Sequence, residues 1–125
     1  MTHDILAGKL AESDIISLHC PLTDRTQNIM NAEAFAKMKK TAILINVARG
    51  PVVDEQALYD ALVRNQIAAA GLDVLCEEPM SADNPLLKIK DSKRLLITPH
   101  IAWASVEART HLMEIIHGQV KDFFA

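Results

Sequence analysis

The chain is short of cysteine and of basic charge, and each shortage excludes a class of protein. Its 125 residues include two cysteines, Cys20 and Cys76, which make neither a disulfide framework nor a metal-binding spacing. The formal net charge is −3, so no basic surface indicates nucleic-acid binding. No apolar run approaches the roughly 18 residues of a membrane span, and the first residues do not read as a signal sequence. We therefore expect a cytoplasmic protein without a metal, nucleic-acid or membrane partner.

Glycine is also scarce, and this bears on phosphate binding. The four glycines are Gly8, Gly50, Gly71 and Gly118. No two of them are close enough to build a Gly-x-Gly-x-x-Gly loop, which holds the pyrophosphate of a dinucleotide at a helix N-terminus. The sequence therefore offers no pyrophosphate loop of this type.

What the chain does contain is a regular alternation of strand and helix patterns. Strands are predicted at residues 15–19, 42–46, 68–74 and 95–98, and helices at 5–12, 32–38, from 54 onward and at 105–123. Asn31, Asp54 and Ser105 are the predicted N-caps, and residues 79–92 are predicted to be a loop with a turn at Asn84-Pro85. The apolar helix positions expected to share a face are Leu58, Leu62 and Val63 in one helix and Leu112, Ile115, Ile116 and Val120 in the last. This alternation predicts an α/β fold with about four parallel strands and flanking helices.

Three apolar runs each end at a residue that can carry charge: Arg49, Glu78 and His100. Such runs are typical of parallel strands buried on both faces, and the small residues 68–71 suit close packing of a helix. Ligands of open parallel sheets bind outside the carboxyl ends of the strands. We therefore expect Arg49, Glu78 and His100 on one rim, as a carboxylate anchor and an acid/base pair.

The same runs carry motifs that resemble one enzyme family. Residues 46–50 read Asn-x-x-Arg-Gly, residues 73–79 read Asp-Val-x-x-x-Glu-Pro, residues 98–100 read Thr-Pro-His, and residues 19–23 read His-x-Pro-Leu-Thr. In this order they resemble the D-isomer-specific 2-hydroxyacid dehydrogenases, from about residue 10 to the C-terminus. Residues 99–105 are similar to the glycerate dehydrogenase (hydroxypyruvate reductase) branch.

The resemblance implies roles for the three rim residues. Arg49 would bind the substrate carboxylate with its rigid fork of donors, and His100 would exchange a proton with the substrate oxygen. Glu78 would hydrogen-bond the imidazole and favour its charged form. The simpler interpretations are a surface salt bridge for Arg49 and a structural histidine at His100.

The resemblance also implies a nicotinamide cofactor, NAD or NADP. Asp73 would meet the nicotinamide carboxamide, and Trp103 has the simpler alternative of packing under the last helix. The positions that match cofactor-binding residues of the family are Cys20, Val47, Ala48, Arg49, Asp73, His100, Ile101, Ala102 and Trp103.

Residues 1–125 are therefore expected to form a partial NAD(P)-binding Rossmann domain, the second half of a doubly wound parallel sheet. The Gly-rich loop half and the substrate domain are not in the sequence. The family enzyme would reduce a 2-keto acid such as hydroxypyruvate to a D-2-hydroxy acid with NAD(P)H, while the chain alone is expected to be inactive. The alternatives are a non-catalytic half-domain, natural or engineered, that folds and associates, and a small regulatory module that binds keto acids. We also expect a homo-oligomer, because the strand at 15–19 and the last helix would be exposed.

Overall fold

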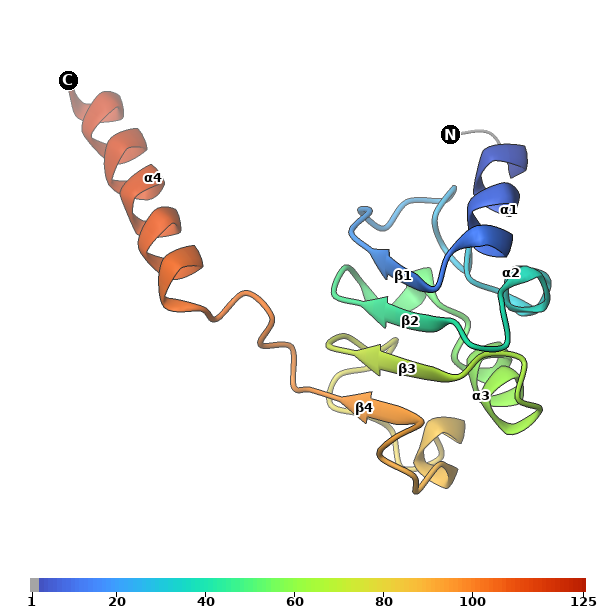
Figure 1. The fold of residues 1–125 in the computed structure, drawn as a ribbon. Coiled ribbons are helices and arrows are strands. Elements are labelled where there is room, and N and C mark those ends of the chain that lie inside the picture. Colours follow the sequence, from blue (N-terminus) through green and yellow to red (C-terminus); the bar gives the residue numbers. More distant parts are fainter. Residues whose placement is uncertain (1–2) are drawn as a thin grey trace.

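The structure is a computed structural model that describes residues 3–125, with side-chain burial from residue 8 onward. Four parallel strands form one sheet in the order β1-β2-β3-β4, which confirms the predicted α/β fold (Figure 1). The strands are β1 (Ile15–Leu18), β2 (Ile43–Asn46), β3 (Ala69–Leu72) and β4 (Leu95–Ile97). The α-helices are α1 (His3–Glu12), α2 (Ala32–Lys37), α3 (Glu55–Val63) and α4 (Val106–Phe124), and the 3-10 helices are η1 (Gly50–Val52) and η2 (Pro85–Lys88).

Three helices begin at the predicted capping residues. The side-chain oxygen of Asn31 accepts a hydrogen bond from the Ala34 N–H at 3.1 Å, and that of Asp54 accepts from Ala57 at 3.0 Å. Ser105 caps α4 in the same way. Each cap satisfies a backbone donor that has no partner within its helix, which is why these helices start where they do.

Among the described residues, helices cover only one face of the sheet. Leu44, Ala70 and Leu72 are buried against the helices, in a core that includes Phe35 of α2 and Leu58 of α3. The prediction that the strands are buried on both faces is wrong. Alternate strand residues point away from the helices, and no described helix covers the face on which they lie. Ile15 and Leu96 on that other face are 61% and 60% exposed. We call it the open face; its residues are Ile15, Ser17, Ile43, Ile45, Ala69, Gly71 and Leu96.

Two local predictions also need correction. Val63 was expected beside Leu62 in the buried stripe of α3, but its side chain is 57% exposed, because neighbouring helix positions point about 100° apart. The segment 79–92 is not all loop: it contains η2, whose Asn84 cap accepts from the Leu86 N–H at 2.9 Å and whose Leu86 is buried. The strands are also one to three residues shorter than predicted.

The last helix stands apart from the sheet (Figure 1). No residue of α4 is buried, and its apolar side chains Leu112, Ile115, Ile116 and Val120 are between 41% and 52% exposed. The expected edge position of β1 is confirmed. Within the described part of the chain, none of the helices combines the length and apolar character needed to cross a membrane.

Candidate active site

The site is built where β2, β3 and β4 end. Parallel pairing brings their carboxyl ends to one edge, so the segments that carry Arg49, Glu78 and His100 leave the sheet side by side. The predicted contact between Glu78 and His100 is confirmed: His100 Nδ1 lies 2.9 Å from Glu78 Oε2. Arg49 is exposed at the same rim, where its Nη1 donates to the Ala48 carbonyl at 2.7 Å.

The state of the Glu78–His100 pair follows from its hydrogen bonds. Glu78 Oε1 accepts from the Leu75 N–H at 2.9 Å while Oε2 faces the imidazole. The Leu75 N–H and the His100 side chain together hold the pKa of Glu78 below its ordinary value. An ionised carboxylate can only accept, so His100 Nδ1 carries the hydrogen. The other ring nitrogen, Nε2, is therefore the one free to exchange a proton with a ligand.

His100 is held in an unusual backbone conformation. Its φ of 57° lies in the left-handed region, which L-residues with side chains adopt at an energetic cost. The Asp73 carboxylate holds the loop that contains His100, residues 98–102, in place through three hydrogen bonds. Its Oδ1 accepts from the Thr98 hydroxyl at 2.6 Å and the Ile101 N–H at 2.9 Å, and its Oδ2 accepts from the Ala102 N–H at 2.8 Å.

Asp73 is itself buried, with 6% of its surface exposed. Burial raises the pKa of Asp73, but the hydrogen bonds from Thr98, Ala102 and Ile101 together outweigh it and leave the pKa below its ordinary value. The carboxylate is therefore charged at neutral pH. In this geometry Asp73 anchors the His100 loop, a structural duty that the sequence motif alone did not indicate.

Arg49 is placed by the fully buried Asn46, the first residue of the Asn-x-x-Arg-Gly motif, for which the sequence analysis gave no role. Asn46 Nδ2 donates to the Arg49 carbonyl and Asn46 Oδ1 accepts from the Ala48 N–H, both at 3.0 Å. The next residue, Gly50, packs against the backbone of Leu75, where an added Cβ would lie 1.9 Å from the Leu75 carbonyl carbon. The turn of Arg49 and the loop of Glu78 are therefore in direct contact. A polar residue ending an apolar strand was the available signal for Asn46.

A hollow of about 360 Å³ opens on the open face beside this rim. Gly71 lies in it, so the prediction that Gly71 suits close helix packing is wrong: the helices pack on the opposite face, and an added Cβ at Gly71 would meet nothing within 4 Å. The lining is mostly apolar, with two polar side chains at the rim, and consists of Ile45, Val47, Gly71, Leu72, Asp73, Leu96, Thr98, Ile101 and Ala102. The lining includes four of the predicted cofactor positions, which are Val47, Asp73, Ile101 and Ala102.

The remaining predicted cofactor positions lie around the rim but outside the lining of the hollow. Ala48 is buried and Cys20, which follows β1, is partly buried. Trp103 is 58% exposed, and its Nε1 donates to the His100 carbonyl at 2.8 Å. The alternative that Trp103 packs under the last helix is therefore wrong, because α4 extends away from this loop.

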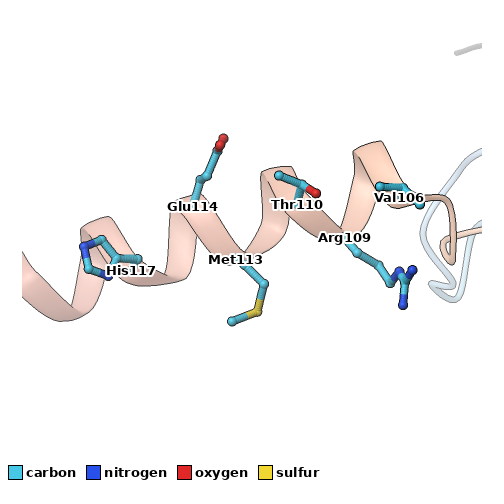
Figure 2. A pocket seen from close by; sticks show the side chains of 6 residues that line it. All are labelled: Val106, Arg109, Thr110, Met113, Glu114 and His117. Atoms are coloured by element: carbon cyan, nitrogen blue, oxygen red, sulfur yellow. The ribbon is translucent and has the colours of Figure 1, made fainter.

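A larger hollow, of about 630 Å³, runs along α4 and is not a comparable site. Figure 2 shows that all its lining side chains project from one helix, so the hollow has no opposite wall. They are Val106, Arg109, Thr110, Met113, Glu114 and His117. Among the described residues, no group of three or more His, Cys, Asp or Glu side chains is arranged to hold a metal ion.

Comparison with known proteins gives this rim its context. The family model described as "D-isomer specific 2-hydroxyacid dehydrogenase, NAD binding domain" matches residues 2–102. The chain belongs to this family. It is 49% identical over 114 residues to a hydroxypyruvate reductase of Blautia hydrogenotrophica. The aligned residues cover 91% of this chain and 34% of that reductase.

Solved dehydrogenases of this kind share the fold. The D-isomer specific 2-hydroxyacid dehydrogenase of Xanthobacter autotrophicus Py2, in complex with NADPH and MES, aligns with a TM-score of 0.73 at 46% identity, over 80% of this chain and 32% of that one. The D-lactate dehydrogenase of Aquifex aeolicus, complexed with NAD and lactic acid, aligns with a TM-score of 0.81 at 36% identity, over 95% and 39%. The chain thus spans about a third of the length of these dehydrogenases.

Proposed function

We propose that this chain carries the catalytic residues of an NAD(P)-dependent dehydrogenase that reduces a 2-keto acid such as hydroxypyruvate to a D-2-hydroxy acid. The observation that carries the proposal is the Glu78–His100 pair, joined at 2.9 Å on the rim that also bears Arg49 and the apolar hollow. An arginine, a carboxylate-bound histidine and an apolar site for the nicotinamide ring are what the reduction of a charged keto acid needs.

Each rim residue has a defined task in the proposed reaction. Arg49 binds the substrate carboxylate through its guanidinium fork, which fixes the orientation of the keto group. His100 donates the proton on Nε2 to the keto oxygen as that oxygen gains the carbonyl electron pair, and removes the same proton in the reverse direction. Glu78 stays ionised and stabilises the imidazolium that precedes the transfer.

A bound dihydronicotinamide would supply the hydride to the keto carbon. In our proposal Val47, Ile101 and Ala102 line the ring, and Asp73 lies at the edge where the carboxamide would sit. Cys20, Ala48, Arg49, His100 and Trp103 complete the proposed cofactor contacts. The apolar lining and the two polar groups of the hollow fit the nicotinamide half. Both NAD and NADP remain candidates, since the aligned crystal structures contain one or the other.

We further propose that residues 1–125 act as the part of an NAD(P)-binding Rossmann domain that bears the catalytic groups. The adenine half of the cofactor needs a pyrophosphate loop, which the four separated glycines do not provide. Misplacing the reacting ring by about 1 Å can cost roughly a hundredfold in rate, so the chain by itself is expected to show no substantial turnover. The proposed location is the cytoplasm, in keeping with the two free cysteines.

An NADH-oxidation assay with hydroxypyruvate tests both statements. The chain alone should give no steady turnover. Fusing to the N-terminus of this chain the residues that precede the matched segment in the Blautia hydroxypyruvate reductase should give turnover that Arg49→Lys and His100→Ala each abolish. Turnover that survives His100→Ala would refute the assigned acid/base role, and turnover by the chain alone would refute the need for the loop.

A second candidate function, association without catalysis, is favoured by the uncovered apolar surfaces. The open face exposes Ile15 and Leu96, β1 is an edge strand, and α4 has no buried residue. Exposed strand edges and large apolar patches are templates for pairing with another chain, and we propose a second copy of this chain as that partner. Light scattering at tens of micromolar should give at least a dimer mass. A monomer mass would refute this association.

A further inference from the structure

Glu55, the first residue of α3, holds the loop that carries Glu78. Its Oε1 accepts from the Cys76 N–H at 2.7 Å and its Oε2 accepts from Asn84 Nδ2, also at 2.7 Å. Both partners belong to the segment between β3 and η2 in which Glu78 lies. One carboxylate therefore fastens this segment to α3 at two points, on either side of Glu78.

The Asn84 amide that donates to Glu55 is held in one orientation. Asn84 is buried, and its Oδ1 accepts from the Leu86 N–H at 2.9 Å, so its amide cannot turn without breaking that bond. Burial and the neighbouring Glu55 raise the pKa of the Cys76 thiol to about 12. The thiol therefore stays protonated and does not repel the Glu55 carboxylate. A glutamine at position 55 would keep one of the two bonds and set a donor against a donor at the other.

The connection from Glu55 to the site is short. Cys76 directly follows Leu75, whose N–H donates to Glu78 Oε1 and whose carbonyl lies against Gly50. Glu55 and Gly50 hold the same stretch of backbone from different elements. That stretch presents the N–H on which the orientation of the Glu78 carboxylate depends.

We propose that Glu55 is a positioning residue for the Glu78–His100 pair: it fixes the Leu75–Cys76 backbone so that the Glu78 carboxylate meets the imidazole. The inference rests on the proposed function for its catalytic meaning. The competing explanation is that Glu55 only complements the dipole of α3, at whose first turn it stands. An aspartate would serve the dipole equally well, but it is one methylene shorter and cannot reach both Cys76 and Asn84.

The test measures the pKa of the Glu78 carboxyl by 13C NMR titration of the chain. Glu55→Asp keeps the charge and shortens the reach, and Glu55→Gln keeps the length and removes the charge. Glu77→Gln is the matched control, because Glu77 is exposed and adjacent to Glu78. His100→Ala marks the value that Glu78 takes without its imidazole partner. Asp73, the other carboxylate that acts on Glu78, is unchanged in all four variants.

The sign of the shift separates the explanations. Loss of positioning weakens the bonds that lower the pKa of Glu78, so Glu55→Asp should raise it toward its value in His100→Ala. Glu55→Gln should raise it as well, although removing a nearby negative charge would by itself lower it. Glu77→Gln should leave it unchanged or lower it. Because the readout is the carboxyl itself, a chain without dehydrogenase activity still gives a result.

A folded Glu55→Asp variant with the wild-type Glu78 titration would overturn the proposal. If that variant does not fold, the criterion applies to Glu55→Gln: a folded variant with the wild-type Glu78 titration would overturn the proposal. Loss of the folded state in both variants would overturn it too, since Glu55 would then support the whole domain rather than this loop.

Discussion

The substitution Asp73→Asn tests the anchor under His100. The carboxylate accepts three hydrogen bonds, from Thr98, Ile101 and Ala102. An asparagine can keep the two on Oδ1, but its amide group would face the Ala102 N–H, donor against donor. A lost bond to a charged group together with an unsatisfied buried donor costs roughly 2 kcal/mol, and weakening the other two bonds adds about 1 kcal/mol.

The expected destabilisation is therefore about 3 kcal/mol at pH 7, or a fall in Tm of about 12 °C for a domain of this size. Urea unfolding followed by circular dichroism measures it directly. Asp24→Asn is the control, because Asp24 is exposed, and it should change the free energy of unfolding by less than about 0.5 kcal/mol.

The pH dependence gives an independent check. The pKa of Asp73 is lowered in the folded state, so its contribution is full above the ordinary value of 3.8 and is lost as pH falls through the folded value. The stability gap between the wild type and Asp73→Asn should therefore stay constant from pH 7 to about pH 5 and shrink below pH 3.8. A gap under about 1 kcal/mol at pH 7, or one that does not shrink in acid, would refute this account of the anchor.

Three further substitutions probe the contact between Gly50 and Leu75, the hollow that contains Gly71, and the hydrogen bonds of Arg94. Gly50→Ala should destabilise by about 3 kcal/mol in urea unfolding, since the added Cβ would lie 1.9 Å from the Leu75 carbonyl, whereas Gly118→Ala, with no atom within 4 Å, should not destabilise. Gly71→Val should leave the free energy of unfolding within about 0.5 kcal/mol of the wild-type value. It should weaken the binding of reduced nicotinamide mononucleotide, measured by NMR shift titration, at least about tenfold. Unchanged binding would place the ring elsewhere. Arg94→Lys should cost about 2 kcal/mol, because a lysine cannot bond the carbonyls of Leu62 and Ala68 together as the guanidinium does at 2.6 Å each; Lys93→Arg is its exposed control.

The features that sequence predicted well are those set by local chemistry. Asn31, Asp54 and Ser105 were identifiable because an N-cap bonds a backbone N–H three residues on. The shared rim followed from apolar runs that each end at a chargeable residue, since parallel strands align their carboxyl ends. The contact between Glu78 and His100 followed from the family motifs.

The features that sequence missed depend on contacts between distant segments or on which surfaces are covered. The bonds from Glu55 join residues 21 and 29 positions apart, and no period or motif marks them. The open face was missed for another reason: an apolar run indicates that a strand can be buried on both sides, but not that a helix is available for each side. The same error applies to Gly71: its small size suggests room for a packed helix, but Gly71 lies in the hollow on the open face, where no described helix packs.

The proposed acid/base geometry depends on β2, β3, β4 and the segments that follow them. Glu78 is oriented by Leu75, the imidazole by Glu78, and the backbone of His100 by Asp73, and all of these lie between residues 73 and 100. Neither α4 nor the edge strand β1 contributes a hydrogen bond to this set. The exposed apolar surfaces of α4 and β1 therefore lie on elements that the pair does not need, and the open-face residues of β2, β3 and β4 make none of its hydrogen bonds. Covering these surfaces, by a second copy or by further parts of a dehydrogenase, would leave the pair as it stands. What such a cover would change is the hollow beside it: water would be excluded from the face where the ring is proposed to bind, and the charges of Arg49 and Glu78 would act more strongly on a substrate there.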